Sequence, residues 1–117
     1  MEIIIKAIYD KTPDGYRIEF QTEVGSAQGL WVDKESPRLN EPYQVEFATS
    51  EDLRFGHNVL VNDASKSLIQ TVGSYTQILG EVGIIYPNSL SVILKLGNES
   101  VMLPIEGNIR MDEGMNI

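Results

Sequence analysis

Residues 90–105 read LSVILKLGNESVMLPI, and this stretch is the clearest indication of fold class in the chain. Apolar side chains occupy every second position of its first half, at Leu90, Val92, Leu94 and Leu96. A period of two gives a β-strand one buried face. Residues 97–98 are Gly-Asn, which fits a two-residue hairpin loop, because glycine at the first loop position adopts the positive φ of a type II′ turn. The stretch therefore predicts a β-hairpin.

The same alternation recurs along the chain and predicts strands at residues 2–9, 16–23, 28–33, 43–48, 67–72, 75–86, 90–96 and 99–105. Residues 13–15, Pro-Asp-Gly, form a turn between the first two strands. In the second strand one face is expected to be core, and it carries Tyr16, Ile18, Phe20 and Thr22. The pattern predicts an all-β fold, a single small antiparallel barrel of oligonucleotide-binding or related type with about eight strands.

Three regions depart from this alternation. Gly80 and Gly83 interrupt the long strand at 75–86, which is typical of a bulge or bend that lets a sheet curl and close. Residues 48–67 are irregular, and a helical start near residues 49–53 should soon end at Gly56, so we expect a loop with at most one turn. We expect residues 1–105 to form one barrel domain and residues 106–117 a polar tail or an edge extension.

Composition is that of an ordinary globular protein. The chain has 117 residues, of which 42% are hydrophobic and 22% charged, and this size suits one domain. No apolar run approaches the roughly 18 residues of a membrane span, and the first residues lack the basic region of a signal peptide. There is no cysteine, so no disulfide framework forms. We expect a cytoplasmic protein with no membrane partner.

The charge balance bears on partners. Seventeen acidic and nine basic side chains give a formal net charge of −8. Such a field repels phosphate backbones and attracts basic proteins, so we expect a protein partner and no nucleic acid. The alternative is that the acidity only maintains solubility.

The sequence contains no recognisable catalytic or cofactor motif. His57 is the only histidine, and without cysteine a structural zinc site would need carboxylates around a single imidazole. The nucleophile elbow G-x-S-x-G, the phosphate loop G-x-x-x-x-G-K-[ST], the dinucleotide motif G-x-G-x-x-G and the calcium loop are all absent. We therefore expect no catalytic residue, no cofactor, no metal and no enzymatic activity.

Several segments together resemble a known group of proteins. These are residues 5–10, 14–20, 29–31, 43–47 and 90–97, which cover most of the predicted strands. They are similar to small bacterial β-barrel proteins associated with polymorphic or contact-dependent growth-inhibition toxin loci, in which the small partner acts as an immunity protein. The resemblance implies a β-barrel that neutralises a cognate toxin by binding. Its motifs are strand faces and turns, so it transfers no binding residue.

Candidate contacts follow from combining acids with nearby aromatic anchors. The central loop is the first choice as a contact region. A second group of candidates lies at and just after Trp31, and a third lies near the C-terminus. The candidates are Trp31, Asp33, Glu35, Glu51, Asp52, Phe55, Asp112 and Glu113. The alternative is that these residues have no binding role, with the aromatic side chains in the core and the acids on an ordinary surface.

A second function from another class stays open. The barrel can instead bind a small molecule or nucleic acid on an aromatic face that uses Tyr16, Trp31 and Tyr43. Few basic residues are available to line a groove beside the rings, which weakens the hypothesis that bases stack on this aromatic face. An unclosed barrel would also leave a strand edge through which the protein can form a homodimer.

Overall fold

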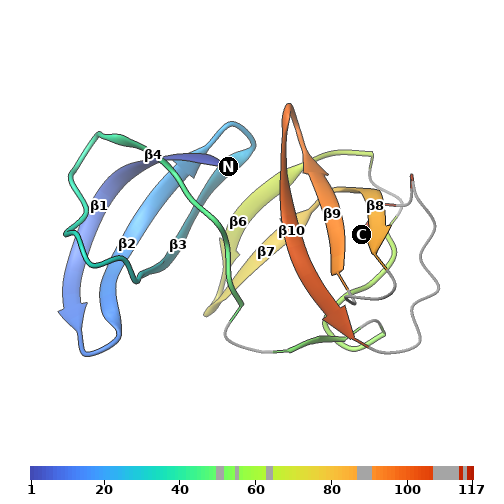
Figure 1. Ribbon diagram of the computed structural model, residues 1–117, viewed down its shortest axis with the longest axis horizontal. Coiled ribbons are helices and arrows are strands. Elements are labelled where there is room, and N and C mark those ends of the chain that lie inside the picture. The colour runs from blue at the N-terminus through green and yellow to red at the C-terminus, as the bar shows by residue number, and fades with distance from the viewer. Residues whose placement is uncertain (50–51, 55, 63–64, 87–90, 107–113, 115) are drawn as a thin grey trace. The chain divides into compact units, whose positions relative to one another are not determined.

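The computed structural model describes residues 1–49, 52–54, 56–62, 65–86, 91–106, 114 and 116–117 (Figure 1). Within these residues the structure contains strands and no helix, and so no helix that is long and apolar enough to cross a membrane. The strands are β1 (Glu2–Thr12), β2 (Gly15–Thr22), β3 (Gly25–Trp31), β4 (Pro42–Gln44), β5 (Leu53–Arg54), β6 (Leu68–Val72), β7 (Tyr75–Leu79), β8 (Glu81–Tyr86), β9 (Ser91–Leu96) and β10 (Glu99–Glu106). The prediction of an all-β, barrel-like fold is confirmed.

Contacts divide the chain into two compact units. The N-terminal unit comprises Glu2–Val45 and Leu68–Ile78, and the C-terminal unit comprises Met1, Glu46–Ser67 and Leu79–Ile117. The first contains a sheet of order β3-β2-β1-β4 and most of the β6–β7 hairpin. The second contains a sheet of order β5-β10-β9-β8, in which only the β5–β10 pair is parallel. The division does not test whether residues 1–105 form one domain, which stays a prediction.

The sheet of the N-terminal unit is strongly curled. Trp31 ends one edge strand, β3, and Tyr43 lies on the other edge strand, β4, yet their ring centroids are 4.8 Å apart. Three strand spacings of about 4.8 Å would separate these edges in a flat sheet. Register shifts in β1, between Ile5 and Ala7 and between Ile8 and Asp10, are the bulges that bend the sheet.

The concave face of this sheet forms the core of the N-terminal unit. The predicted inward face of β2 is confirmed at Ile18, Phe20 and Thr22, all of which are buried, and Tyr16 is half-buried. Their neighbours on the adjacent strands are buried too, namely Ile3, Ile5, Ala27 and Trp31. Burial of these apolar side chains is the main contribution to the stability of the unit.

Two turns in this sheet have the same chemistry, ten residues apart. In the turn at residues 12–15, Thr12 Oγ1 donates to Gly15 O at 2.9 Å and accepts from Asp14 N at 3.2 Å. In the turn at residues 22–25, Thr22 Oγ1 donates to Gly25 O at 2.8 Å and accepts from Val24 N at 3.1 Å. The threonine hydroxyl thus satisfies backbone groups that the two-residue loop leaves unpaired.

No other residue fits at the glycine that closes each turn. Gly15 and Gly25 have φ values of 147° and 141°, and an added Cβ would lie 2.1 Å from Trp31 O and 2.2 Å from Ile69 O, respectively. Both the backbone angle and the approaching carbonyl therefore demand a residue without a side chain.

The hairpin of the C-terminal unit matches its prediction. Leu96 pairs with Glu99 around residues 97–98, and Gly97 has a φ of 66°. Alternate residues of both strands are buried, namely Val92, Leu94, Leu96, Val101, Leu103 and Ile105. Leu90 lies outside the described residues.

The strand predicted at 75–86 is interrupted at both of its glycines. The chain leaves β7 and enters β8 at Gly80, where an added Cβ would lie 2.5 Å from Lys95 O. A register shift between Val82 and Ile84 marks a second irregularity at Gly83. The predicted bend and bulge are both present.

Two other segments differ in detail from the sequence-based expectation. The strand predicted at 43–48 is reduced to β4, and residues 56–58 form a turn held by the carbonyl of Arg54, which accepts from His57 N at 3.1 Å. At the C-terminus, Ile117 exchanges two backbone hydrogen bonds of 2.9 Å with Gly80, and Gly114 N donates to Val82 O at 2.7 Å. The end of the chain thus extends the sheet beside β8.

The two matched turns generate a prediction about stability. We expect Gly25→Ala to lower the free energy of unfolding by at least about 2 kcal/mol, because the new methyl group meets the carbonyl of Ile69 at a strained φ. Gly73→Ala is the control: its φ is 61° but nothing lies within 4 Å of the added Cβ, so only about 1 kcal/mol should be lost. Urea unfolding measures both, and equal losses would contradict the proposed clash.

Candidate binding site

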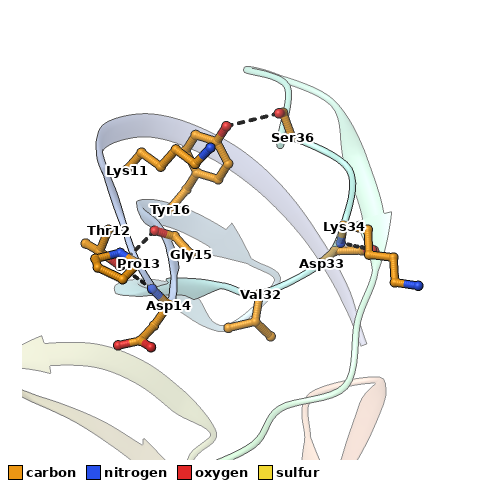
Figure 2. A pocket seen from close by; sticks show the side chains of 10 residues that line it. All are labelled: Lys11, Thr12, Pro13, Asp14, Gly15, Tyr16, Val32, Asp33, Lys34 and Ser36. Carbon is orange, nitrogen blue, oxygen red and sulfur yellow. Dashed lines mark hydrogen bonds between the residues drawn. The ribbon is translucent and has the colours of Figure 1, made fainter.

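A hollow of about 270 Å³ lies at the end of the N-terminal unit where the β1–β2 turn approaches the segment that follows β3. Figure 2 labels the ten residues that line it. They come from two stretches, residues 11–16 and residues 32–36. We call residues 32–36 the strap, because they follow Trp31 at the end of β3 and four of them line the hollow (Figure 2).

Side-chain hydrogen bonds hold the strap in place. Trp31 Nε1 donates to Glu35 O at 2.7 Å, and the hydroxyls of Tyr16 and Ser36 share a hydrogen bond of 3.1 Å (Figure 2). Pro37, which follows directly, is buried. The strap therefore has a defined conformation, although its residues are exposed.

The next residues connect the strap to the opposite edge of the sheet. Arg38 N donates to the hydroxyl of Tyr43 at 3.1 Å, and Asn40 N donates to Ile5 O at 2.7 Å. Asn40 has a φ of 61°, a left-handed conformation that asparagine tolerates better than most residues. Tyr43 thus contacts both the Arg38 amide, through its hydroxyl, and the Trp31 ring.

The lining of the hollow is polar and carries both signs of charge. Lys11 Nζ lies 5.7 Å from the centre of the Tyr16 ring, a cation–π arrangement. Asp33 Oδ1 accepts from Lys34 N at 2.6 Å. The ammonium of Lys34 and the carboxylate of Asp14 point away from the Tyr16 ring (Figure 2). The site can therefore present charges and hydroxyls to a polar or charged group of a partner.

The structure brings part of the predicted contact set together at the strap. Asp33 and Glu35 are both exposed there. Trp31 was predicted as an aromatic anchor for a partner; in the structure this residue is only 8% exposed, and its indole N–H donates to Glu35 O. Asp52 is exposed in the C-terminal unit, and its carbonyl accepts from Asn58 Nδ2 at 3.0 Å.

The remaining predicted contacts cannot be placed at the strap. Glu51, Phe55, Asp112 and Glu113 lie outside the described residues. The central loop was the first choice in the sequence analysis, and of its three candidates only Asp52 is described.

The three aromatic residues of the alternative function are also close together. Tyr16 lies opposite Trp31 in the β2–β3 register, and Trp31 contacts Tyr43 edge to face. However, Trp31 is buried and Tyr16 and Tyr43 are half-buried. Trp31 and Tyr43 pack against each other, and Trp31 and Tyr16 form hydrogen bonds to the strap, so the three rings do not form the open surface on which bases stack.

His57 is the one histidine of the chain. Its side chain is exposed in the turn after β5, and no group of three or more His, Cys, Asp or Glu residues that could hold a metal occurs in the described part of the chain. The hollow itself was not predicted from the sequence. The two residues of its lining with an aliphatic hydroxyl, Thr12 and Ser36, are 24 positions apart, and the repeated Thr-x-x-Gly turn was the available signal for only the first of them.

Comparisons add no assignment. Neither a protein-family model, nor a curated protein, nor a solved structure matches the chain.

The anchoring of residue 38 generates a second prediction. We expect Tyr43→Phe to lower the free energy of unfolding by about 1 kcal/mol and to speed hydrogen exchange at the Arg38 amide, because the acceptor for that N–H is removed. Tyr75→Phe is the control, since the Tyr75 side chain is 68% exposed and its hydroxyl makes no hydrogen bond within the described residues. Unchanged exchange at Arg38 would show that the hydroxyl does not hold this segment.

Proposed function

We propose that this protein is a non-enzymatic protein-binding module, an immunity protein that neutralises a basic, nuclease-like bacterial toxin by contact through its acidic surface. The observation that carries the proposal is the net charge of −8 on a fold in which every charged side chain of described burial is exposed or half-buried. Among the described residues the only buried polar side chain is Thr22, so none of the described acids is buried. These acids therefore create a negative electrostatic potential in the surrounding solvent.

The strap supports this function as a rigid carrier of acidic groups. Asp33 and Glu35 are exposed on a backbone that Trp31 and Tyr16 fix through hydrogen bonds. A preordered segment loses less conformational entropy on binding than a flexible one. Val32 is 73% exposed between Trp31 and Asp33, and it offers an apolar contact beside the charges.

The alternative of a small-molecule or nucleic-acid site has less support. The hollow has about 270 Å³, slightly below the usual range of about 300–1,000 Å³ for ligand pockets. Ligand pockets are mostly apolar, whereas residues such as Lys11, Asp14, Asp33 and Lys34 line this one. These properties suit the insertion of a single polar side chain from a protein partner better than the enclosure of a cofactor.

Affinity capture from native lysate tests the proposal. We expect the immobilised protein to retain a basic protein that about 0.5 M salt releases, because surface charges are screened beyond a few ångströms at high ionic strength. The identified partner is then purified and assayed alone. The proposal requires that an equimolar amount of this protein suppress the partner's nuclease or growth-inhibiting activity, and a partner whose activity is unchanged would refute it.

A matched pair of variants tests the role of the strap. Asp33→Asn with Glu35→Gln and Glu19→Gln with Glu46→Gln each reduce the formal charge from −8 to −6. We expect only the first pair to slow association with the purified basic partner, by at least about threefold at low salt, because its charges lie in the contact. Equal slowing by both pairs in surface plasmon resonance would show that only the net charge matters.

A further inference from the structure

The outer face of the C-terminal sheet carries an apolar row that crosses three strands. Met102 on β10 lies opposite Ile93 on β9, which lies opposite Ile84 on β8. Met102 is 55% exposed and Ile84 is 45% exposed, while Ile93 between them is half-buried. The three strands lie side by side in Figure 1, so the row is continuous. We call Ile84, Tyr86, Ile93, Met102 and Pro104 the outer apolar face.

A second row of the same face lies next to the first. Tyr86 lies opposite Ser91, which lies opposite Pro104, and Tyr86 is 42% exposed. On the other side of the apolar row the face ends at an ion pair of 3.5 Å between Lys95 Nζ and Glu81 Oε2. An apolar centre with a charged border is the arrangement of protein contact surfaces.

The bulge at Gly83 is what turns these side chains outward. Val82 is fully buried, and with uninterrupted alternation Ile84 and Tyr86 would share its inward face. The register shift between Val82 and Ile84 reverses this, so that Ile85 is opposite the buried Val92 and Ile84 and Tyr86 face outward. A bulge that exposes two large apolar side chains reduces core burial, and bulges commonly re-aim side chains at functional places.

The edge of β8 is not available for pairing with a strand of a partner. Gly114 and Ile117 pair with the backbone of Val82 and Gly80, and Asn116 bridges to Glu81. This pairing occupies backbone groups that an added strand of a partner would need. Docking at β8 must therefore use the face of the sheet.

Charge identifies the occupant of the outer apolar face. The C-terminal unit contains nine acidic and four basic residues, a formal charge of −5 out of the total of −8. Two copies of the chain would bring together two units of the same net charge, which disfavours a symmetric dimer. A protein with an apolar centre and basic residues around it is complementary in both respects.

We propose that the outer apolar face is a docking surface for a basic protein that inserts apolar side chains over Ile84, Ile93 and Met102. The inference rests on the proposed function in taking a basic protein as partner, but it locates a contact that the strap does not include. Acidic residues then steer the encounter, and the apolar row supplies the contact that holds the complex.

Titration with a designed peptide, followed by amide chemical shifts of the full chain, tests the proposal. The probe is a 15-residue amphipathic peptide of Leu and Lys, compared with its Leu and Glu counterpart. We expect the Leu/Lys peptide to shift amides of β8, β9 and β10 and the Leu/Glu peptide to leave them unchanged. Met102→Thr with Ile84→Thr should weaken the Leu/Lys peptide at least about tenfold, since each side chain loses apolar area from the contact.

Matched controls make the result decisive. Leu30→Thr with Val72→Thr removes two exposed apolar side chains from the N-terminal unit, 46% and 51% exposed, and should leave the affinity unchanged. Shifts that map elsewhere, or an unchanged affinity of the Met102 and Ile84 variant, would overturn the proposal. Concentration-dependent dimerisation with shifts at the same amides would overturn it in favour of a second copy.

The two proposals fail in different ways. If the Met102 and Ile84 variant still binds the partner captured from lysate as tightly as the original protein, the docking surface is wrong and the immunity function stands. If the Leu/Lys peptide binds the face but the captured partner's activity is not suppressed, the immunity function is wrong and the surface stands.

Discussion

The alternation of side chains along each strand, and the bulges that interrupt it, determine what each sheet buries. Two register shifts in β1 bend the N-terminal sheet until Trp31 and Tyr43, from its opposite edges, are in contact. One shift in β8 leaves Val82 inside and moves Ile84 to the surface. Because a slip of one residue moves every later side chain to the other face, these few places determine both the core and the exposed surface.

The strap shows how a core residue can position surface charge. Trp31 contributes its ring to the core of the N-terminal unit and its indole N–H to the carbonyl of Glu35. A buried indole nitrogen needs an acceptor, so the burial of the ring and the conformation of the strap are coupled. The acids beside it are held by local geometry, with the amide of Lys34 bound to the carboxylate of Asp33.

Strand positions and the buried faces of β2, β9 and β10 could be predicted from the sequence, because a period of two and turn glycines are local signals. The predicted irregularities at Gly80 and Gly83 were local signals as well. The strap could not be predicted, since Trp31 and Tyr16 hold it and Tyr43 and Ile5 hold the residues that follow it. Trp31 and Tyr43 meet only because the sheet curls. For the same reason the sequence left open whether Trp31 is a partner contact or part of the core, whereas the structure buries it.

Charge and apolar surface would contribute to binding in different ways. At physiological ionic strength the Debye length is about 8 Å, so the acids accelerate the approach of a basic protein but hold it only weakly once salt screens them. A long-lived complex needs apolar area removed from water, and the strap offers little beyond Val32. The row of Met102, Ile93 and Ile84 offers such apolar area. An acidic protein that neutralises a basic one thus has a physical reason to keep such a face exposed despite the cost to its own stability.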